Sequence, residues 1–201
     1  MSGIPNALTL SRLILAPVFG LLILDDRPWS LALACAVALF ALISDWMDGY
    51  LARLWRQVSS FGICFDPIAD KAFIISAFVS LICHPYLGLP LFPLVLIIVR
   101  EMGVSGLRIV ILTKARSSLA ETRPLAAERF GKIKSAVQFG VILFFTFALW
   151  GSYFEGPRMA SEEICSVLFW AVAIMTLLSG LPYFWKHRTA LARAWQSIPT
   201  D

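Results

Sequence analysis

Four aspartates form two short groups in a chain that is otherwise mostly apolar. Asp45 and Asp48 end one long apolar run, and Asp66 and Asp70 begin the next. On a helix that turns by about 100° per residue, Asp45 and Asp48 lie about 60° apart, and Asp66 and Asp70 about 40° apart. Carboxylates at membrane depth are costly and mark functional sites. If the two faces meet, four like charges repel one another unless cations neutralise them.

The chemistry of these side chains selects the cation. Carboxylate oxygens without Cys or His favour Mg²⁺ or Mn²⁺ over zinc, and two such ions about 4 Å apart suit displacement at phosphorus. We therefore predict that Asp45, Asp48, Asp66 and Asp70 hold two divalent cations, Mg²⁺ or Mn²⁺. Structural interpretations stay open: Asp66 before Pro67 also has the pattern of a helix N-cap, and the first two aspartates that of a solvated helix end.

The helical face that carries Asp45 also carries small residues. Gly49 and Ala52 lie about 40° and 20° from Asp45 and leave room for a bulky group against the backbone. Arg53, at about 80° from Asp45, borders the same face and can reach an anion. The pattern indicates a site for a large anionic ligand beside the cations.

Long apolar segments must position these groups. Of 201 residues, 59% are hydrophobic and 15% are charged, whereas a soluble domain carries about 25% charged residues. Six runs approach the roughly 20 apolar residues that a membrane-spanning helix needs. They cover residues 8–24, 30–53, 66–86, 89–113, 133–150 and 164–185. We predict an all-α integral membrane protein with six transmembrane helices in a single domain, residues 1–201.

Lysine and arginine are unevenly distributed between the two ends of these runs. The end that includes both termini carries most of them, and the other end carries Arg27 and Arg158. The positive-inside rule therefore places the N- and C-termini and the aspartates at the cytoplasmic side. The net charge of +4 is explained by this topology and by anionic headgroups. Nucleic acid is not an expected partner, because basic and aromatic residues are not interleaved.

The aspartate spacing has a known counterpart. The segment DWMDGYLAR, eight further residues and then GICFDPIAD resemble the signature of the CDP-alcohol phosphatidyltransferases at every position. The resemblance implies a six-helix membrane fold, usually homodimeric, with two metals at a cytoplasmic site and Asp70 as general base. The positions that it assigns to the CDP moiety are Thr9, Asp45, Gly49, Ala52 and Arg53, with Arg12 near Thr9.

The fourth apolar run carries charges of its own. Glu101, Ser105 and Arg108 are spaced i, i+4, i+7 on one face, with Arg100 beside them. One interpretation is a buried Arg–Glu pair that orients the helix. The other is a basic pocket for a phosphate on the acceptor alcohol.

Two lysines open the fifth run in GKIKSAVQ. Lys132 and Lys134 either anchor the helix at the membrane surface by snorkelling or extend the basic pocket of the fourth run. We predict an acceptor-phosphate site formed by Arg100, Arg108, Lys132 and Lys134.

Further segments narrow the expected acceptor. IPNALTLSRLILAP, DPIADK, REMGVSGLR and GKIKSAVQ are similar to family members that use glycerol 3-phosphate. This resemblance implies transfer of the phosphatidyl group of CDP-diacylglycerol to glycerol 3-phosphate, giving phosphatidylglycerol phosphate and CMP. A cardiolipin synthase, a phosphatidylinositol phosphate synthase and, outside the enzymes, a small cation transporter stay open. The short chain without a recognisable transit peptide favours a bacterial inner membrane, and residues 117–130 are predicted to form a cytoplasmic loop.

Overall fold

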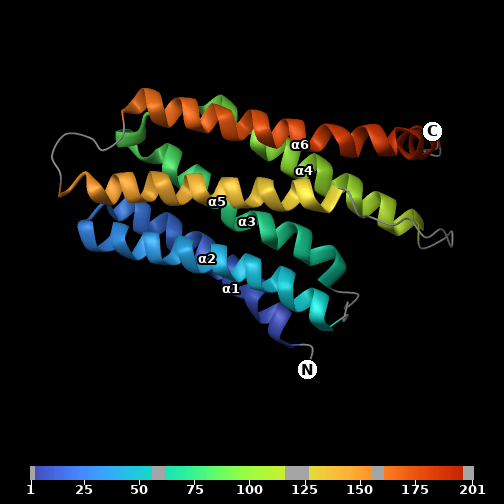
Figure 1. The fold of residues 1–201 in the computed structure, drawn as a ribbon, viewed down its shortest axis with the longest axis horizontal. Coiled ribbons are helices and arrows are strands. Elements are labelled where there is room, and N and C mark those ends of the chain that lie inside the picture. Colours follow the sequence, from blue (N-terminus) through green and yellow to red (C-terminus); the bar gives the residue numbers. More distant parts are fainter. Residues whose placement is uncertain (1–2, 56–61, 116–126, 155–160, 197–201) are drawn as a thin grey trace, which may run out of the picture.

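The described part of the chain folds into six α-helices (Figure 1). The computed structural model describes the backbone of residues 3–55, 62–115, 127–154 and 161–196, and the side chains of residues 11–47, 71–107, 134–154 and 161–181. The helices are α1 (Gly3–Asp25), α2 (Pro28–Trp55), α3 (Gly62–Cys83), α4 (Leu91–Ala115), α5 (Ala127–Gly151) and α6 (Glu162–Gln196), with a 3-10 turn η1 (Pro85–Leu87) after α3. The predicted all-helical fold is confirmed.

The six helices run alternately in opposite directions along the long axis of the bundle (Figure 1). The start of α1 and the end of α6 lie toward the same end, together with the ends of α2 and α4. Each of α1 and α4 packs against α3, and α5 packs against α2, α3 and α6. The signature aspartates belong to the halves of α2 and α3 that are nearer this end.

Small residues allow α1 and α3 to approach closely. Ser76 Oγ of α3 donates a hydrogen bond to the carbonyl oxygen of Ala16 at 3.1 Å. One turn further along, a Cβ atom placed on Gly20 would lie 2.8 Å from Ser80 Oγ, so the missing side chain makes room for the serine. Such contacts hold membrane helices together where lipid removes the hydrophobic driving force. They keep α1 against the helix that carries two of the aspartates.

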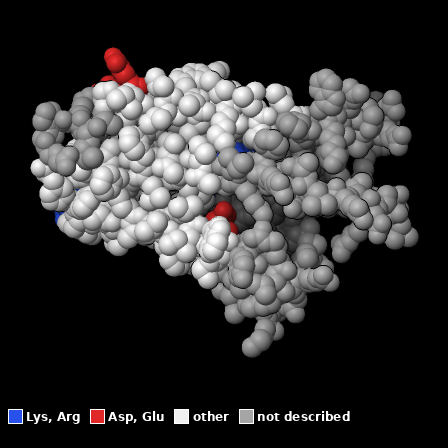
Figure 2. Space-filling model, in the orientation of Figure 1, with Lys and Arg blue, Asp and Glu red and all other residues white. Residues whose placement is uncertain are grey.

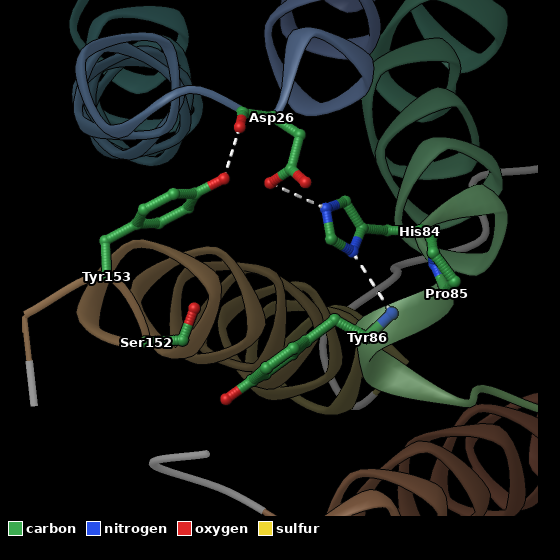
Figure 3. Close-up of a pocket in the computed structure, with 6 residues that line it drawn as sticks. All are labelled: Asp26, His84, Pro85, Tyr86, Ser152 and Tyr153. Atoms are coloured by element: carbon green, nitrogen blue, oxygen red, sulfur yellow. Dashed lines mark hydrogen bonds and ion pairs between the residues drawn. The ribbon is translucent and has the colours of Figure 1, made fainter. Parts of the chain in front are cut away.

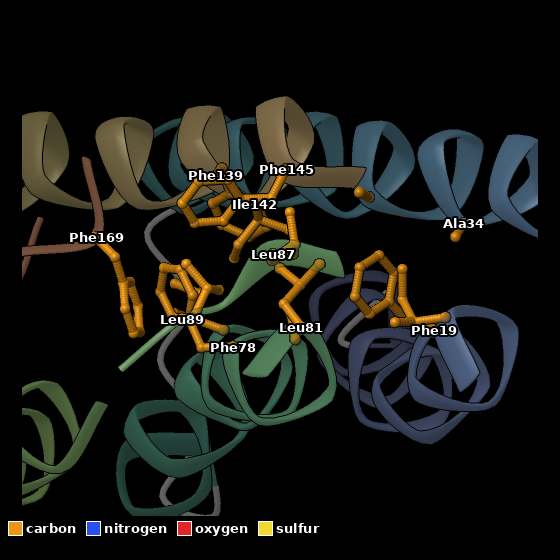
Figure 4. Close-up of a cluster of buried hydrophobic side chains, with 14 of the residues drawn as sticks. Phe19, Ala34, Phe78, Leu81, Leu87, Leu89, Phe139, Ile142, Phe145 and Phe169 are labelled. Atoms are coloured by element: carbon orange, nitrogen blue, oxygen red, sulfur yellow. The ribbon is translucent and has the colours of Figure 1, made fainter. Parts of the chain in front are cut away.

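Aromatic rings fill the interior between the helices (Figure 4). The ring centroid of Phe73 on α3 lies 5.6 Å from that of Phe19 on α1 and 5.8 Å from that of Phe139 on α5. Further along α3, the centroid of Phe78 lies 5.2 Å from that of Phe169 on α6. All five rings are buried, so α3 is held by packing against three other helices.

Replacing Phe73 by Ala is expected to lower the stability of the bundle. Phe73 is 0% exposed, and Phe→Ala substitutions at buried positions cost about 3–5 kcal/mol, because packing contacts are lost and a cavity is left. Thermal unfolding in detergent measures the loss. Val79→Ala, which changes an exposed residue of the same helix, is the control. Equal shifts for the two variants would contradict the packing argument.

The outer surface of the bundle is apolar. Large apolar side chains are exposed on all six helices, among them Leu21, Trp46, Val79, Val99 and Val167. The described atoms on the face shown in Figure 2 belong almost entirely to residues that are neither acidic nor basic. Within the described residues, three segments are long and apolar enough to cross a membrane, namely Pro28–Met47, Lys134–Gly151 and Glu162–Leu181. The chain is therefore an integral membrane protein.

Several helix boundaries differ from the predicted ones. Helix α3 begins at Gly62, so Asp66 and Pro67 lie inside the helix and the N-cap interpretation of Asp66 is wrong. Helix α5 begins at Ala127 and includes the last residues of the predicted loop 117–130, while residues 116–126 lie outside the described part. Helix α6 continues to Gln196. Each helix extends past its apolar run, because hydropathy marks the part in lipid and not the polar ends.

Candidate active site

Asp45 pairs with a buried arginine of the first helix. Arg12 Nη1 on α1 donates a hydrogen bond to Asp45 Oδ1 on α2 at 2.7 Å. The Arg12 side chain is 2% exposed, whereas that of Asp45 is 35% exposed. The guanidinium therefore fixes the direction of a carboxylate that still reaches the surface, through a charge-assisted bond. The resemblance alone does not imply this contact.

The other signature residues are placed by their backbone. They are Asp48, Gly49, Ala52 and Arg53 in α2, and Asp66 and Asp70 in α3. The further predicted residues are Thr9 in α1, Arg108 in α4 and Lys132 in α5. All of these side chains lie outside the described part, so the meeting of the four aspartates stays a prediction. The backbone does provide the helical spacing on which that prediction depends.

Helix α1 joins the two helices that carry the aspartates, because it packs against both α2 and α3. Among the side chains that the structure describes, no three His, Cys, Asp or Glu residues gather as metal ligands, and three of the four predicted ligands are outside that set. The described member, Asp45, offers a partly exposed carboxylate held by Arg12. Such hard oxygen donors fit Mg²⁺ or Mn²⁺.

The buried carboxylate of Glu101 on α4 contacts cationic side chains from three helices. Lys134 Nζ of α5 donates to Glu101 Oε1. Lys71 Nζ of α3 and Arg100 Nη1 of α4 lie 3.5 Å and 3.3 Å from the other oxygen, Oε2. The Glu101 side chain is 1% exposed. The Arg–Glu pair that the sequence left open is therefore present, and Lys134 of the predicted phosphate pocket contacts the same carboxylate.

Arg100 is also held by the last helix. Its Nη2 donates a hydrogen bond to Ser179 Oγ at 2.9 Å. A Cβ atom placed on Gly180 would lie 3.0 Å from Arg100 Nε, so this glycine lets the guanidinium lie against α6. These contacts support the helix-orienting interpretation for Arg100, because its Nη1 and Nη2 donate to Glu101 and Ser179.

Lys71 is the residue of this cluster that the sequence reasoning missed. Its Nζ donates a hydrogen bond to Ser105 Oγ on α4, and its side chain is 21% exposed. Lys71 directly follows Asp70, so it links the aspartate-bearing part of α3 to the charged face of α4. The signal that could have identified it is a lone positive charge at the start of an apolar run, next to a signature aspartate.

A separate hollow of about 450 Å³ lies at the other end of the bundle (Figure 3). His84 Nε2 lies 3.0 Å from Asp26 Oδ1, and His84 Nδ1 accepts a hydrogen bond from Tyr86 N at 3.4 Å. The Tyr153 hydroxyl donates to the carbonyl oxygen of Asp26. These contacts tie together the segments that follow α1, α3 and α5. The residues around the hollow therefore have a structural role, and the hollow is not part of the candidate active site.

Comparison with known proteins extends the resemblance beyond the aspartate signature. Residues 2–180 match the family described as CDP-alcohol phosphatidyltransferase. Relatives from Shigella flexneri serotype 5b (strain 8401) and Escherichia coli (strain K12) are each 32% identical over 189 residues, which is 94% of this chain and 97% of the relative. Both are named CDP-diacylglycerol–glycerol-3-phosphate 3-phosphatidyltransferase. The similarity thus spans nearly the whole chain.

Proposed function

The chain belongs to the CDP-alcohol phosphatidyltransferase family, and from this premise we propose that it transfers the phosphatidyl group of CDP-diacylglycerol to glycerol 3-phosphate, giving phosphatidylglycerol phosphate and CMP. The observation that carries the proposal is the 32% identity, over 94% of the chain, to relatives named for this reaction. The partly buried cluster of Lys71, Arg100 and Lys134 supports it, because the acceptor brings a phosphate that needs cationic partners.

Catalysis of this displacement rests on positioning and on charge stabilisation. The acceptor hydroxyl attacks the phosphorus of the phosphatidyl group, and the bond to CMP breaks. Asp70 takes the proton from the hydroxyl, and Arg53 holds the diphosphate. Two divalent cations, held by Asp45, Asp48, Asp66 and Asp70, supply electrostatic stabilisation of the diphosphate and the leaving group. The nucleotide site is shaped by Thr9, Asp45, Gly49 and Ala52.

The acceptor phosphate is bound by cationic side chains of α4 and α5 in this proposal. Arg108 on α4 and Lys132 and Lys134 on α5 are its partners in this proposal. Arg100 contributes positive charge near the phosphate without a direct contact to it, because its guanidinium already donates hydrogen bonds to Glu101 and Ser179.

All six helices cross the membrane in this proposal, with both termini and the active site on the cytoplasmic side of a bacterial inner membrane. The distribution of lysine and arginine supports this orientation, as does the common end of the bundle at which α1 begins and α6 ends. Acyl chains stay in the bilayer, whereas CMP and glycerol 3-phosphate are water-soluble. A site at the cytoplasmic interface serves both. A second copy of the chain completes a homodimer, on the resemblance to the family.

The purified protein tests the proposed reaction when each acceptor is offered separately. With CDP-diacylglycerol and Mg²⁺ or Mn²⁺ present, we expect CMP release to depend on glycerol 3-phosphate. Release that depends instead on phosphatidylglycerol or on inositol phosphate would assign a different branch of the family. If no acceptor releases CMP and cations cross sealed vesicles that contain the protein, the transporter alternative is correct.

Replacing Arg108 by Ala is expected to raise the KM for glycerol 3-phosphate. Loss of one charge-assisted contact to the phosphate costs about 1.5–3 kcal/mol, or roughly a 10- to 100-fold rise in KM. Steady-state kinetics with each substrate varied in turn measure the effect. Arg108→Lys keeps the charge and should recover part of it. Unchanged acceptor kinetics with a lower melting temperature would instead give Arg108 a structural role.

A further inference from the structure

Three cations meet one carboxylate between α3, α4, α5 and α6. Among the side chains that the structure describes, Lys71, Arg100 and Lys134 place three cationic groups within 4 Å of the Glu101 carboxylate. Gathering positive charge among membrane helices is costly. A pair that only orients α4 requires Arg100 and Glu101. The two lysines come from two other helices, so the cluster is larger than a helix-orienting pair requires.

The two lysines occupy different oxygens of the same carboxylate. Lys134 contacts Oε1 of Glu101, and Lys71 lies 3.5 Å from Oε2. Gln138 Nε2 donates to Oε1 at 3.3 Å and to Thr176 Oγ1 of α6 at 3.2 Å. This second contact ties the Gln138 amide to α6, so the direction of the carboxylate is fixed. Glu101 therefore keeps both ammonium groups on one side of α4.

The cluster opens to the outside at Lys71. The side chains of Glu101 and Lys134 are 1% and 7% exposed, whereas that of Lys71 is 21% exposed. Ser105, which accepts the hydrogen bond from Lys71, lies one turn after Glu101 on α4. Lys71 is thus the most exposed of the three cations, and it directly follows Asp70.

On the basis of the proposed function, we propose that Lys71 is a further ligand of the acceptor phosphate and that Glu101 is the positioning residue that holds Lys71 and Lys134 together for it. Asp70 and Lys71 then act on the two ends of the same small molecule. The carboxylate receives the proton of the attacking hydroxyl, and the ammonium binds the phosphate. An acceptor without a phosphate cannot use this second contact.

Substitutions that remove one charge at a time test this assignment. We expect Lys71→Gln to raise the KM for glycerol 3-phosphate at least about tenfold, as the loss of a charge-assisted contact does. Glu101→Gln should raise it as well, because the two lysines lose the carboxylate that holds them. The KM for CDP-diacylglycerol should change by less than about twofold, because uniform binding of that substrate is untouched. Lys71→Arg should retain most of the acceptor affinity. Glu163→Gln, which removes the same charge from an exposed position at the start of α6, should leave both KM values unchanged.

Direct binding separates this inference from the proposed reaction. Calorimetry with glycerol 3-phosphate and with inorganic phosphate, without CDP-diacylglycerol, should show binding to the parent and at least about tenfold weaker binding to Lys71→Gln. Equal binding by parent and Lys71→Gln, or equal acceptor KM values, overturns the inference even if the parent makes phosphatidylglycerol phosphate. If the unsubstituted protein binds phosphate through Lys71 but transfers the phosphatidyl group only to another acceptor, the proposed function is overturned instead. If Glu101→Gln does not fold, Lys71→Gln decides, because it keeps the contact between Glu101 and Lys134.

Discussion

Asp70→Asn is expected to abolish turnover while CDP-diacylglycerol still binds. A general base contributes about 10²- to 10⁴-fold to rate, and Asn also removes a charged metal ligand. We therefore expect kcat to fall by at least about 10³-fold. Single-turnover release of CMP measures the chemical step, and equilibrium binding of CDP-diacylglycerol measures the remaining affinity.

Asp25→Asn provides the matched control for this variant. Asp25 is the last residue of α1 and its carboxylate lies 3.6 Å from Arg27 Nε, at the end of the bundle away from the signature. This substitution should leave turnover unchanged. Normal rates for Asp70→Asn would refute its assignment as the base, and loss of both activity and CDP-diacylglycerol binding would point to a collapsed site.

Chelation of divalent cations is expected to remove activity completely, and added Mg²⁺ or Mn²⁺ should restore it. Four carboxylates that converge without cations repel one another and leave the diphosphate without charge stabilisation. Binding of Mn²⁺ observed by electron paramagnetic resonance provides a measure that is independent of turnover. We expect two bound ions per chain and weaker binding in Asp45→Asn.

Arg12 provides a check on how Asp45 takes part in that binding. Arg12→Gln removes the guanidinium that holds Asp45 Oδ1 at 2.7 Å and keeps an amide donor in its place. Its Mn²⁺ affinity should lie between those of the unsubstituted protein and Asp45→Asn, since partners of ligating carboxylates influence metal affinity.

For the chelation experiment, full activity of the unsubstituted protein after exhaustive removal of divalent cations would rule out the metal-dependent mechanism.

The sequence predicted the six helices well because each contains a long apolar run, and it misplaced their ends for the same reason. Helix α3 starts at Gly62, one turn before Asp66, because a proline is tolerated in a membrane helix when neighbouring groups satisfy the backbone. Helix α6 continues beyond its apolar run to Gln196. Hydropathy reports the solvent around a helix, and backbone hydrogen bonding determines where the helix stops.

The candidate site was predictable where its residues share one helix. The spacing of Glu101 and Ser105 on one face of α4 is read directly from the 3.6-residue period. Lys71 was not predictable in this way, because its partners Ser105 and Glu101 lie on another helix. The contact between Arg100 and Ser179 spans 79 residues. Such pairings depend on which helices pack together, and a single sequence does not state this.

The cluster around Glu101 also constrains how the chain is made. Lys71 leaves the ribosome before Glu101, and Lys134 follows Glu101 by 33 residues. A lysine without a partner costs up to about 3 kcal/mol at the centre of a membrane helix and less toward the end of an apolar run, and Lys71 lies toward the start of the run 66–86. Insertion of α3 and α4 together as a hairpin supplies Lys71 with its carboxylate at once. In that order of insertion, α5 would bring Lys134 to a carboxylate that α4 already supplies.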